Sequence, residues 1–318
     1  MQDIPVVIVG GGLSGLYAAL LLEQKGIAYR LLEARNTLGG RIAVAKCSDA
    51  HATNNSTDID QAESSAAFDL GPSWFWPDYQ TQLSTLIESL DLSRFAQFEA
   101  GDMMVERIAN QPPVRMQGYK SAPPSMRLVG GMAALIDALY ARLDASCIMT
   151  SQTVQQLNRT PQHIEVQSED SSGHVTGHVT TFRAQHVLLA LPPRLVEGRI
   201  AFQPALPQDL SEQWRETATW MAPHAKYVAV YESPFWRDAG LSGAARSAIG
   251  PLTEIHDAST LESDGALFGF FGVPAQVRQS VSDTVLKEHC RAQLVRLFGE
   301  QASTPKAEYL RDWATDPL

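Results

Sequence analysis

A glycine-rich turn near the N-terminus is the feature that most constrains the fold of this chain. Gly10, Gly12 and Gly15 have the spacing G-x-G-x-x-G; an apolar run from Ile4 to Val9 precedes them, and a helical pattern follows. The first glycine permits a tight turn, the second lets the backbone approach a pyrophosphate, and the third lets helix and strand pack closely. The helix N-terminus then offers free N–H groups to a phosphate. We therefore predict a Rossmann-like dinucleotide-binding unit.

An acidic residue follows the glycine turn at the spacing that this motif requires. The apolar segment 29–32 reads as a second strand and leads into Glu33, about twenty residues after the glycines. A carboxylate at this point can accept hydrogen bonds from ribose hydroxyls. A glycine-rich turn in an ordinary α/β protein is the alternative, and it does not account for the strand, the helix and the acid together.

The composition is that of a globular protein, and it excludes several classes of partner. Hydrophobic residues make up 44% of the chain and charged residues 19%, which fits a sizeable core. The net charge is −10 with scattered Lys and Arg, so we expect no nucleic acid partner. No stretch approaches the roughly 18 apolar residues of a membrane span, and no signal peptide pattern precedes Ile4, so we expect a cytoplasmic protein. Cys47, Cys147 and Cys290 lack C-x-x-C spacing, which predicts reduced thiols and no metal site.

The remaining chain mixes short strands with helices. Apolar periodicity and turn residues predict helices at 78–90, 132–143 and 277–298, and strands at 154–157, 163–166, 186–191, 226–231, 267–272 and 309–313. Strand 186–191 reads as buried, and the polar segment 48–67 predicts an exposed, mobile insertion. The alternation around the glycine turns predicts an α/β fold, with a Rossmann-like parallel sheet and a second, mixed α+β domain.

Six short segments, spread over nearly the whole chain, carry a resemblance to a known family. They are the glycine fingerprint, L-E-A-R-N-T-L-G-G-R-I at 32–42, F-D-L-G-P-S-W at 68–74, L-V-G-G-M at 128–132, V-L-L-A-L-P-P at 187–193 and A-K-Y-V-A-V-Y-E-S-P-F-W at 225–236. In this order they resemble the flavin-containing amine oxidases, which include monoamine, polyamine and L-amino-acid oxidases. The first two segments mark a wider flavin-binding superfamily, and the last is the narrower match.

This resemblance implies FAD as the cofactor and assigns residues to hold it. The resemblance places the pyrophosphate at the fingerprint residues Gly10, Gly12, Leu13, Ser14 and Gly15, and the adenosine ribose at Glu33 with its neighbours Ala34 and Arg35. Gly40 and Arg41 are expected at a phosphate or the flavin side, and Val154 is expected to contact the adenine through its backbone. The isoalloxazine is expected beside Gly71, Pro72, Ser73 and Trp74. Arg41 as a solvated loop cation and Val154 as an ordinary strand residue are the alternatives.

The resemblance also implies a catalytic residue and a reaction. Lys226 matches the family lysine that holds a water near flavin N5; an exposed strand lysine is the alternative. The reaction would oxidise a C–N bond of an amine or amino acid to an imine, with O2 as acceptor and H2O2 released. A cation near the ring could stabilise developing negative charge. Trp74, Phe75 and Trp76 are expected either in the core or as an apolar substrate wall.

The sequence departs from the family pattern in two places. Family members continue beyond Leu318 with a glycine-rich turn that caps the flavin, so we expect this chain to lack one strand of the dinucleotide sheet and to expose a flavin edge. The segment 76–130 is also shorter than in mammalian-type members, which implies a smaller substrate domain and no membrane anchor.

These observations give a domain division and leave other activities open. We expect an FAD-binding domain from 1–76 and 126–205, and a substrate domain from 77–125 and 206–318. A desaturase or dehydrogenase of the same fold, a non-catalytic flavin-binding relative and an NAD-only reductase are the alternatives. Lys226 in its motif argues against the first, and Gly39-Gly40-Arg41 after Glu33 argues against the last.

The expected partners are a small-molecule amine or amino acid and O2. A carboxylate-binding arginine would indicate amino acids, and the sequence does not place Arg237, Arg246 or Arg278. The oligomeric state is open as well, with a homodimer as one option.

Overall fold

The computed structural model describes residues 2–46, 66–171, 178–261 and 264–318. Most of the predicted mobile insertion at 48–67 therefore lies outside the described residues. The chain forms two compact units, each a group of residues in mutual contact: unit 1 comprises residues 1–42, 135–220 and 318, and unit 2 comprises 43–134 and 221–317. The predicted division into a cofactor domain and a substrate domain assigns functions as well as boundaries, and it stays a prediction.

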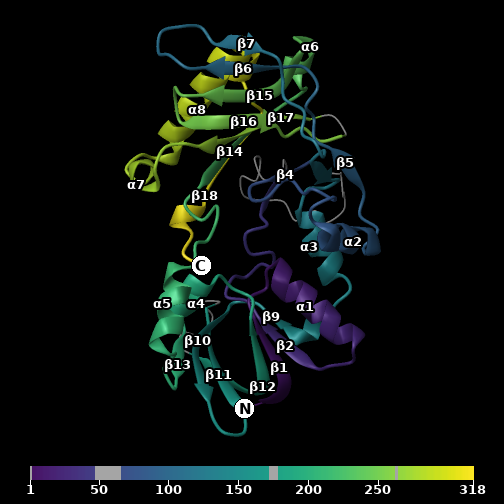
Figure 1. Cartoon of the computed structure of the whole chain (residues 1–318), viewed down its shortest axis with the longest axis vertical. Helices are drawn as coiled ribbons and strands as arrows, with labels where there is room; N and C mark the ends of the chain where they lie inside the picture. The colour runs from purple at the N-terminus through teal and green to yellow at the C-terminus, as the bar shows by residue number, and fades with distance from the viewer. Residues whose placement is uncertain (1, 47–65, 172–177, 262–263) are drawn as a thin grey trace, which may run out of the picture. The chain divides into compact units, whose positions relative to one another are not determined.

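Unit 1 is built on a seven-stranded sheet. Its strand order is β13-β10-β11-β12-β1-β2-β9 (Figure 1). The strands are β1 Gln2–Val9, β2 Tyr29–Leu32, β9 Ile148–Met149, β10 Gln152–Arg159, β11 Ile164–Asp170, β12 Val179–Leu189 and β13 Ala201–Gln203. Strands β12, β1, β2 and β9 run parallel, as expected for a dinucleotide-binding sheet. Strand β11 is antiparallel to both of its neighbours, so the sheet is mixed.

The glycine turn joins β1 to helix α1, Leu13–Gln24. The Gly10 N–H donates to the Leu32 carbonyl at 2.8 Å, which extends the β1–β2 ladder into the turn. Helix α1 buries Gly15, Leu16 and further small or apolar residues on one side. A Cβ added at Gly15 would lie 1.9 Å from the Gly10 carbonyl oxygen. Only a glycine therefore allows the helix to pack this closely on the turn.

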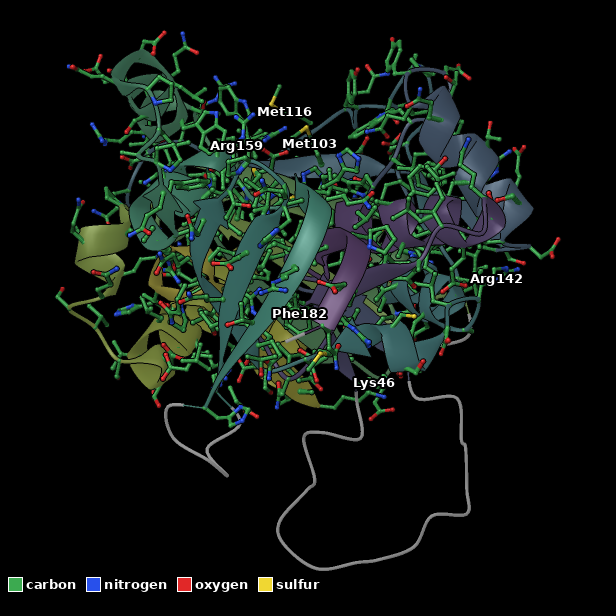
Figure 2. All side chains as sticks on the ribbon, turned by 90° about the horizontal axis from the view of Figure 1, so that it is seen from below. Lys46, Met103, Met116, Arg142, Arg159 and Phe182 are labelled. Carbon is green, nitrogen blue, oxygen red and sulfur yellow. The ribbon has the colours of Figure 1, made fainter. Side chains whose placement is uncertain are left out.

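Unit 2 is built on a second seven-stranded sheet, ordered β18-β14-β17-β16-β15-β6-β7 (Figure 1). The strands are β6 Asp102–Glu106, β7 Val114–Met116, β14 Ala225–Tyr231, β15 Leu241–Ser247, β16 Leu252–Asp257, β17 Gly265–Phe271 and β18 Ala307–Asp312. All neighbours are antiparallel except β6 and β15. Met103 and Met116, labelled in Figure 2, are register partners in the β6–β7 pair at the sheet edge.

Strand β14 is buried along its whole length because both faces of the sheet are covered there. Tyr227 and Tyr231 point to one face and pack in a core with helix α8, Asp283–Phe298. Val228 and Val230 point to the other face and pack against Phe268 and the segment around Phe68. Lys226 shares this second face, since side chains alternate along a strand. The sequence thus places one amine among apolar neighbours.

Smaller elements connect and cover the sheets. They are β3 Val44–Lys46, β4 Ala67–Asp69, α2 Thr81–Ser89, β5 Arg94–Ala96, β8 Met126–Leu128, α3 Ala133–Tyr140, α4 Pro193–Arg199, α5 Gln208–Glu216, α6 Phe235–Asp238 and α7 Ala275–Arg278. The β3–β4 and β5–β8 pairs form two short antiparallel sheets in unit 2. Phe75 pairs with Met126 through backbone hydrogen bonds in both directions, so the segment after β4 is fixed at its far end.

Three predicted elements differ from the structure. The helix expected at 277–298 is two helices, because Ser282 caps the N-terminus of α8 by accepting from the Val285 N–H. The last strand ends at Asp312, whose side chain accepts from the Ala314 N–H and starts a 3₁₀ turn. The strand expected to be buried at 186–191 is the C-terminal part of β12, and Leu188 is 42% exposed there. The buried part of β12 comes earlier, at Phe182 (Figure 2).

We predict that Gly15→Ala destabilises the fold by about 1–3 kcal/mol, the usual cost of overpacking. The added methyl group would meet backbone, which cannot move aside as a flexible side chain can. Chemical denaturation followed by circular dichroism measures the free energy of unfolding.

Gly198→Ala in α4 is the matched control, because no atom lies within 4 Å of the added Cβ. It should be neutral or stabilise by up to about 1 kcal/mol, the helix propensity difference. Equal stability of the two variants would contradict the packing argument.

Candidate functional site

The glycine turn of unit 1 contains one glycine that its own fold does not require. Gly12 has φ −75°, a value open to any residue, and it is the N-cap of α1. A Cβ added there would approach only the Gly39 carbonyl oxygen, at 3.9 Å. By contrast, Gly10 has φ +108° and no room for a Cβ. The open space over Gly12, at the positive end of a helix dipole, fits a diphosphate that approaches the backbone closely.

Glu33 is fixed beside this turn. Its side chain is buried, one carboxylate oxygen accepts from the Gly11 N–H at 2.7 Å, and the other accepts from the Arg35 N–H at 2.8 Å. Each oxygen keeps a further lone pair that can accept from a hydroxyl group. Glu33 therefore shapes the turn and still has acceptor capacity for a ribose.

The other residues predicted for unit 1 lie around the same turn. The Gly39 N–H donates to the Gly11 carbonyl at 2.9 Å, and Gly40, at φ +58°, lies next to Gly12. The Ala34 carbonyl accepts from Ser171, and the Arg35 carbonyl accepts from the Ser151 N–H. The first contact joins the loop after β2 to the glycine turn, and the other two join it to the residues before β10 and after β11.

For two further residues of this group the structure gives the surroundings, and their predicted roles stay predictions. Arg41 is exposed. Val154 points into the core of unit 1 and is 6% exposed, while a bulge interrupts its pairing with β11 between Val154 and Gln156. A bulge leaves backbone groups outside the ladder. Contact through the Val154 backbone alone is compatible with this geometry, and the predicted role stays a prediction.

The second group of predicted residues lies in unit 2, around Lys226. The Lys226 Nζ donates to the Ser73 Oγ at 2.6 Å and to the Gly71 carbonyl at 3.2 Å. It also lies 4.0 Å from the centre of the Phe268 ring, within the range of a cation–π contact. Lys226 is only 2% exposed, so the alternative of an exposed strand lysine is wrong.

Two further charged groups lie buried near this amine. Burial lowers the pKa of the Lys226 amine to about 7; the Asp69 carboxylate opposes this shift and the Arg127 guanidinium adds to it. Burial raises the pKa of Asp69, although the Lys226 charge and a hydrogen bond from the Met132 N–H oppose the rise. Burial also lowers the pKa of Arg127, which donates to the Ala258 and Ser259 carbonyls. The cost of burying charge is therefore the dominant influence at this site.

An aromatic cluster covers the Lys226 side of the sheet. The Trp74 ring lies 5.2 Å from the Phe268 ring and 4.8 Å from the His256 ring, and its Nε1–H donates to Gln97 at 2.8 Å. His256 Nε2 lies 2.7 Å from a carboxylate oxygen of Glu254. Phe75, in contrast, is a fully buried core residue. The stretch 74–76 thus supplies both a site residue and a core residue.

The structure shows the surroundings of the three arginines that could bind a substrate carboxylate. Arg278 is buried and donates to Asp312 and to backbone carbonyls, and Arg246 pairs with Glu254. Arg237 donates twice to one oxygen of the buried Asp257, and its guanidinium lies 3.7 Å from the centre of the Phe98 ring. Arg237 and Phe98 line a cavity of about 710 Å³ within unit 2. Arg246 lines a second cavity in unit 2, of about 450 Å³, so two of the three arginines face a space large enough for a small molecule.

Comparisons with known proteins decide the family. Residues 113–318, well over half of the chain, match the family described as flavin containing amine oxidoreductase, and residues 8–90 match an NAD(P)-binding Rossmann-like domain. The chain belongs to the flavin containing amine oxidoreductases. The predicted family, the two-domain α/β fold and the flavin cofactor are thereby confirmed.

Individual relatives are more distant. The chain is 30% identical over 208 residues to putrescine oxidase of Kocuria rosea. This match covers 60% of this chain and 40% of that protein. It is 25% identical over 191 residues to the probable flavin-containing monoamine oxidase A of Dictyostelium discoideum, with 59% of this chain and 39% of that protein covered. The chain thus spans about 40% of the length of these curated relatives.

Solved structures show the same fold. Wild-type putrescine oxidase bound to putrescine matches with a TM-score of 0.80 at 21% identity, covering 99% of this chain and 86% of that chain. Cyclohexylamine oxidase from Brevibacterium oxydans matches with a TM-score of 0.79 at 17% identity, covering 98% and 86%. At these identities the likeness supports the architecture and not the substrate.

The residues predicted for this flavin-containing family member fall into two groups. The glycine turn, Glu33 and the loop after it lie together in unit 1, and Gly71, Ser73 and Lys226 lie together in unit 2. Their individual roles at a flavin stay predictions. The described residues contain no cluster of three or more side chains suited to a metal ion and no helix long and apolar enough to cross a bilayer.

Sequence reasoning missed four side chains around Lys226. Asp69, Arg127 and His256 come from β4, β8 and β16, and the Ser73 hydroxyl was expected only as part of a backbone segment. The one available signal was Asp69 within F-D-L-G-P-S-W, a carboxylate among apolar residues.

We predict that Gly12→Ala weakens FAD binding at least tenfold and lowers the stability of the fold by at most about 1 kcal/mol, the usual cost of replacing a favoured residue at a helix N-cap by alanine. The protein has room for the added Cβ, which would lie 3.9 Å from the Gly39 carbonyl oxygen, whereas an approaching diphosphate does not. Fluorescence titration with FAD and thermal melting measure the two quantities. A larger loss of stability, or unchanged FAD affinity, would show that the fold and not the ligand requires this glycine.

We also predict a pH-dependent stability difference between Lys226→Met and the parent protein. The folded-state pKa of Lys226, about 7, lies well below the ordinary lysine value of 10.5, so below pH 7 the full cost of burying the charge is present. As the pH rises from 7 towards 10, the folded state releases the proton before the unfolded state does, and this cost declines.

The free energy of unfolding of Lys226→Met minus that of the parent protein should therefore decrease by about 2 kcal/mol from pH 6 to pH 9. Urea denaturation at the two pH values measures it. Asp69 lacks the nearby Lys226 charge in the variant, so its deprotonation at higher pH destabilises the variant. This also lowers the stability difference between the variant and the parent protein as the pH rises. A difference that is constant or grows with pH would contradict the buried-amine assignment.

Proposed function

We propose that this chain is an FAD-dependent oxidase that converts the C–N bond of an amine or amino acid to an imine, with O2 as acceptor and H2O2 released. The observation that carries the proposal is the buried Lys226 amine, held by Gly71 and Ser73 and lying inside the sequence match to the family. An amine with a pKa of about 7 among apolar walls has no evident use for stability, because its burial is costly.

Different residues of the chain would bind the cofactor and stabilise charge during the reaction. FAD, when bound, would supply the redox chemistry: one hydride equivalent, which carries both electrons, would leave the substrate carbon for the flavin, and the two electrons would then pass with two protons to O2 to give H2O2. Gly12 and the N-terminus of α1 would hold the diphosphate, and Glu33 would accept from the ribose hydroxyls. Lys226, in its charged form, would favour negative charge that develops near it in a site with few competing water molecules.

The names of the relatives support an amine or an amino acid as substrate. Putrescine oxidase and monoamine oxidases act on amines by name, and the matched L-amino acid dehydrogenase of Synechocystis and L-tryptophan oxidase of Lentzea aerocolonigenes act on amino acids by name. Lys226 in its strand motif favours the oxidase reading over a desaturase of the same fold.

Two finer points belong to the same proposal. We propose a cytoplasmic location, which is supported by Cys147 and Cys290 being free thiols, since such thiols persist in reducing compartments. The proposed partners are a small-molecule substrate and O2, without nucleic acid or membrane. A homodimer stays an expectation from the sequence.

We predict that Lys226→Met lowers kcat/KM for H2O2 release by about 100-fold or more, the size of the loss when one charge-stabilising group is removed. A peroxidase-coupled assay with a panel of amines and amino acids measures the rate, and the flavin absorbance shows whether FAD stays bound.

Lys287→Met is the matched control, because this lysine of unit 2 also donates to a backbone carbonyl, that of Glu308. It should retain nearly full activity. Parent-like turnover by Lys226→Met with FAD bound would overturn the role of this lysine, and no peroxide from any substrate would overturn the proposed oxidase.

A further inference from the structure

The two acceptors of the Lys226 amine differ in chemistry. Both come from one short segment: the Gly71 carbonyl at 3.2 Å and the Ser73 hydroxyl at 2.6 Å from Nζ. A carbonyl oxygen can only accept a hydrogen bond, whereas a hydroxyl can accept one and donate one. Ser73 is 7% exposed, so its hydroxyl depends on partners within the protein.

This difference matters because the amine has two protonation states. As an ammonium, Lys226 donates to both oxygens. As a neutral amine, it can still donate to the Gly71 carbonyl, while its lone pair accepts from the Ser73 O–H. The contact can therefore persist after the proton leaves for solvent, with the direction of one hydrogen bond reversed.

We propose that Ser73 is the positioning residue for Lys226, and that its hydroxyl holds the amine in place in both protonation states by reversing one hydrogen bond. The proposal deepens the proposed function and rests on it only for the claim that the position of this amine matters to catalysis. The contact itself is a property of the chain.

The charged surroundings explain why a two-way partner is needed. Asp69 is the carboxylate that acts on the amine, but one of its oxygens already accepts from the Met132 N–H at 2.7 Å. Arg127 disfavours the charged amine and is committed to two carbonyls. As a carboxylate Asp69 only accepts, and Arg127 only donates, so neither of these charged groups replaces a hydroxyl that does both.

The remaining titratable groups near the amine come from β18, from β16 and from the residue just before β14. Arg311 of β18 is the register partner of Lys226 and pairs with Asp316. His224 and His256 lie against Phe270 and Phe268, the two rings nearest to the amine. With burial lowering its pKa to about 7, the amine populates both states near neutral pH.

The test is a direct titration of the Lys226 amine, followed by NMR of protein carrying ¹³C at lysine Cε, with FAD added and with Lys226→Met to assign the signal. Ser73→Ala removes the hydroxyl, and Ser73→Thr keeps it. We expect the pKa of Lys226 to fall by about 0.5–1 unit in Ser73→Ala, because the charged form loses the stronger hydrogen bond. Ser73→Thr should titrate within about 0.2 unit of the parent protein, since the donor and acceptor are retained.

Ser247→Ala is the matched control. Ser247 is also 7% exposed and also uses its hydroxyl for a side-chain hydrogen bond, to Glu106, but β16 and β17 separate its strand from β14. It should leave the pKa of Lys226 unchanged. If Ser73→Ala does not fold, Ser73→Cys replaces it, because a thiol keeps the volume and is a weak hydrogen-bonding partner.

Unchanged titration in the variant without the hydroxyl would overturn the positioning role, as would an equal shift in Ser247→Ala. The result is separable from the proposed function. If the pKa of Lys226 shifts in Ser73→Ala but the protein oxidises no amine, the positioning role of Ser73 is supported and the proposed oxidase is rejected. If the protein releases peroxide but this pKa does not shift, the oxidase is supported and the positioning role is rejected.

Discussion

A lysine amine buried on β14, the strand next to the edge of the second sheet, is the constraint on which the rest of unit 2 depends. Removing an ammonium group from water is costly, and the protein answers with a hydroxyl, a carbonyl and an aromatic face rather than with a direct carboxylate partner. Those groups must be brought to β14 from far along the chain. The β3–β4 and β5–β8 pairs, with the Phe75–Met126 hydrogen bonds, fix the segment that carries Gly71 and Ser73.

The glycines of the N-terminal turn separate into two physical roles. Gly10 and Gly15 serve the fold, since one has a left-handed backbone conformation and the other has a carbonyl oxygen where a Cβ would be. Gly12 serves no such need, and the space above it is what a diphosphate requires. A motif that is written as one pattern therefore encodes a packing constraint and a binding constraint side by side.

The sequence was informative where the determinants are local. The strand–turn–helix, Glu33 and the Lys226 strand each lie within a short window, and their types of structure could be predicted. The partners of Lys226 could not, because Ser73 and Lys226 are 153 residues apart and only the folded chain brings them together. Local chemistry also misled in places: the periodicity at 277–298 continues through the break that the Ser282 cap imposes, and the apolar run of β12 at Leu188 is half-exposed.

The central proposal is that the Lys226 amine, held by Ser73, would act on a bound flavin. A crystal structure of the protein with FAD tests this most directly, through the distance from Lys226 Nζ to flavin N5. The account predicts a separation of about 6 Å or less, the reach of one bridging water between two hydrogen bonds. A bound FAD whose ring lies well beyond that distance, with Lys226 still on Ser73, would contradict it.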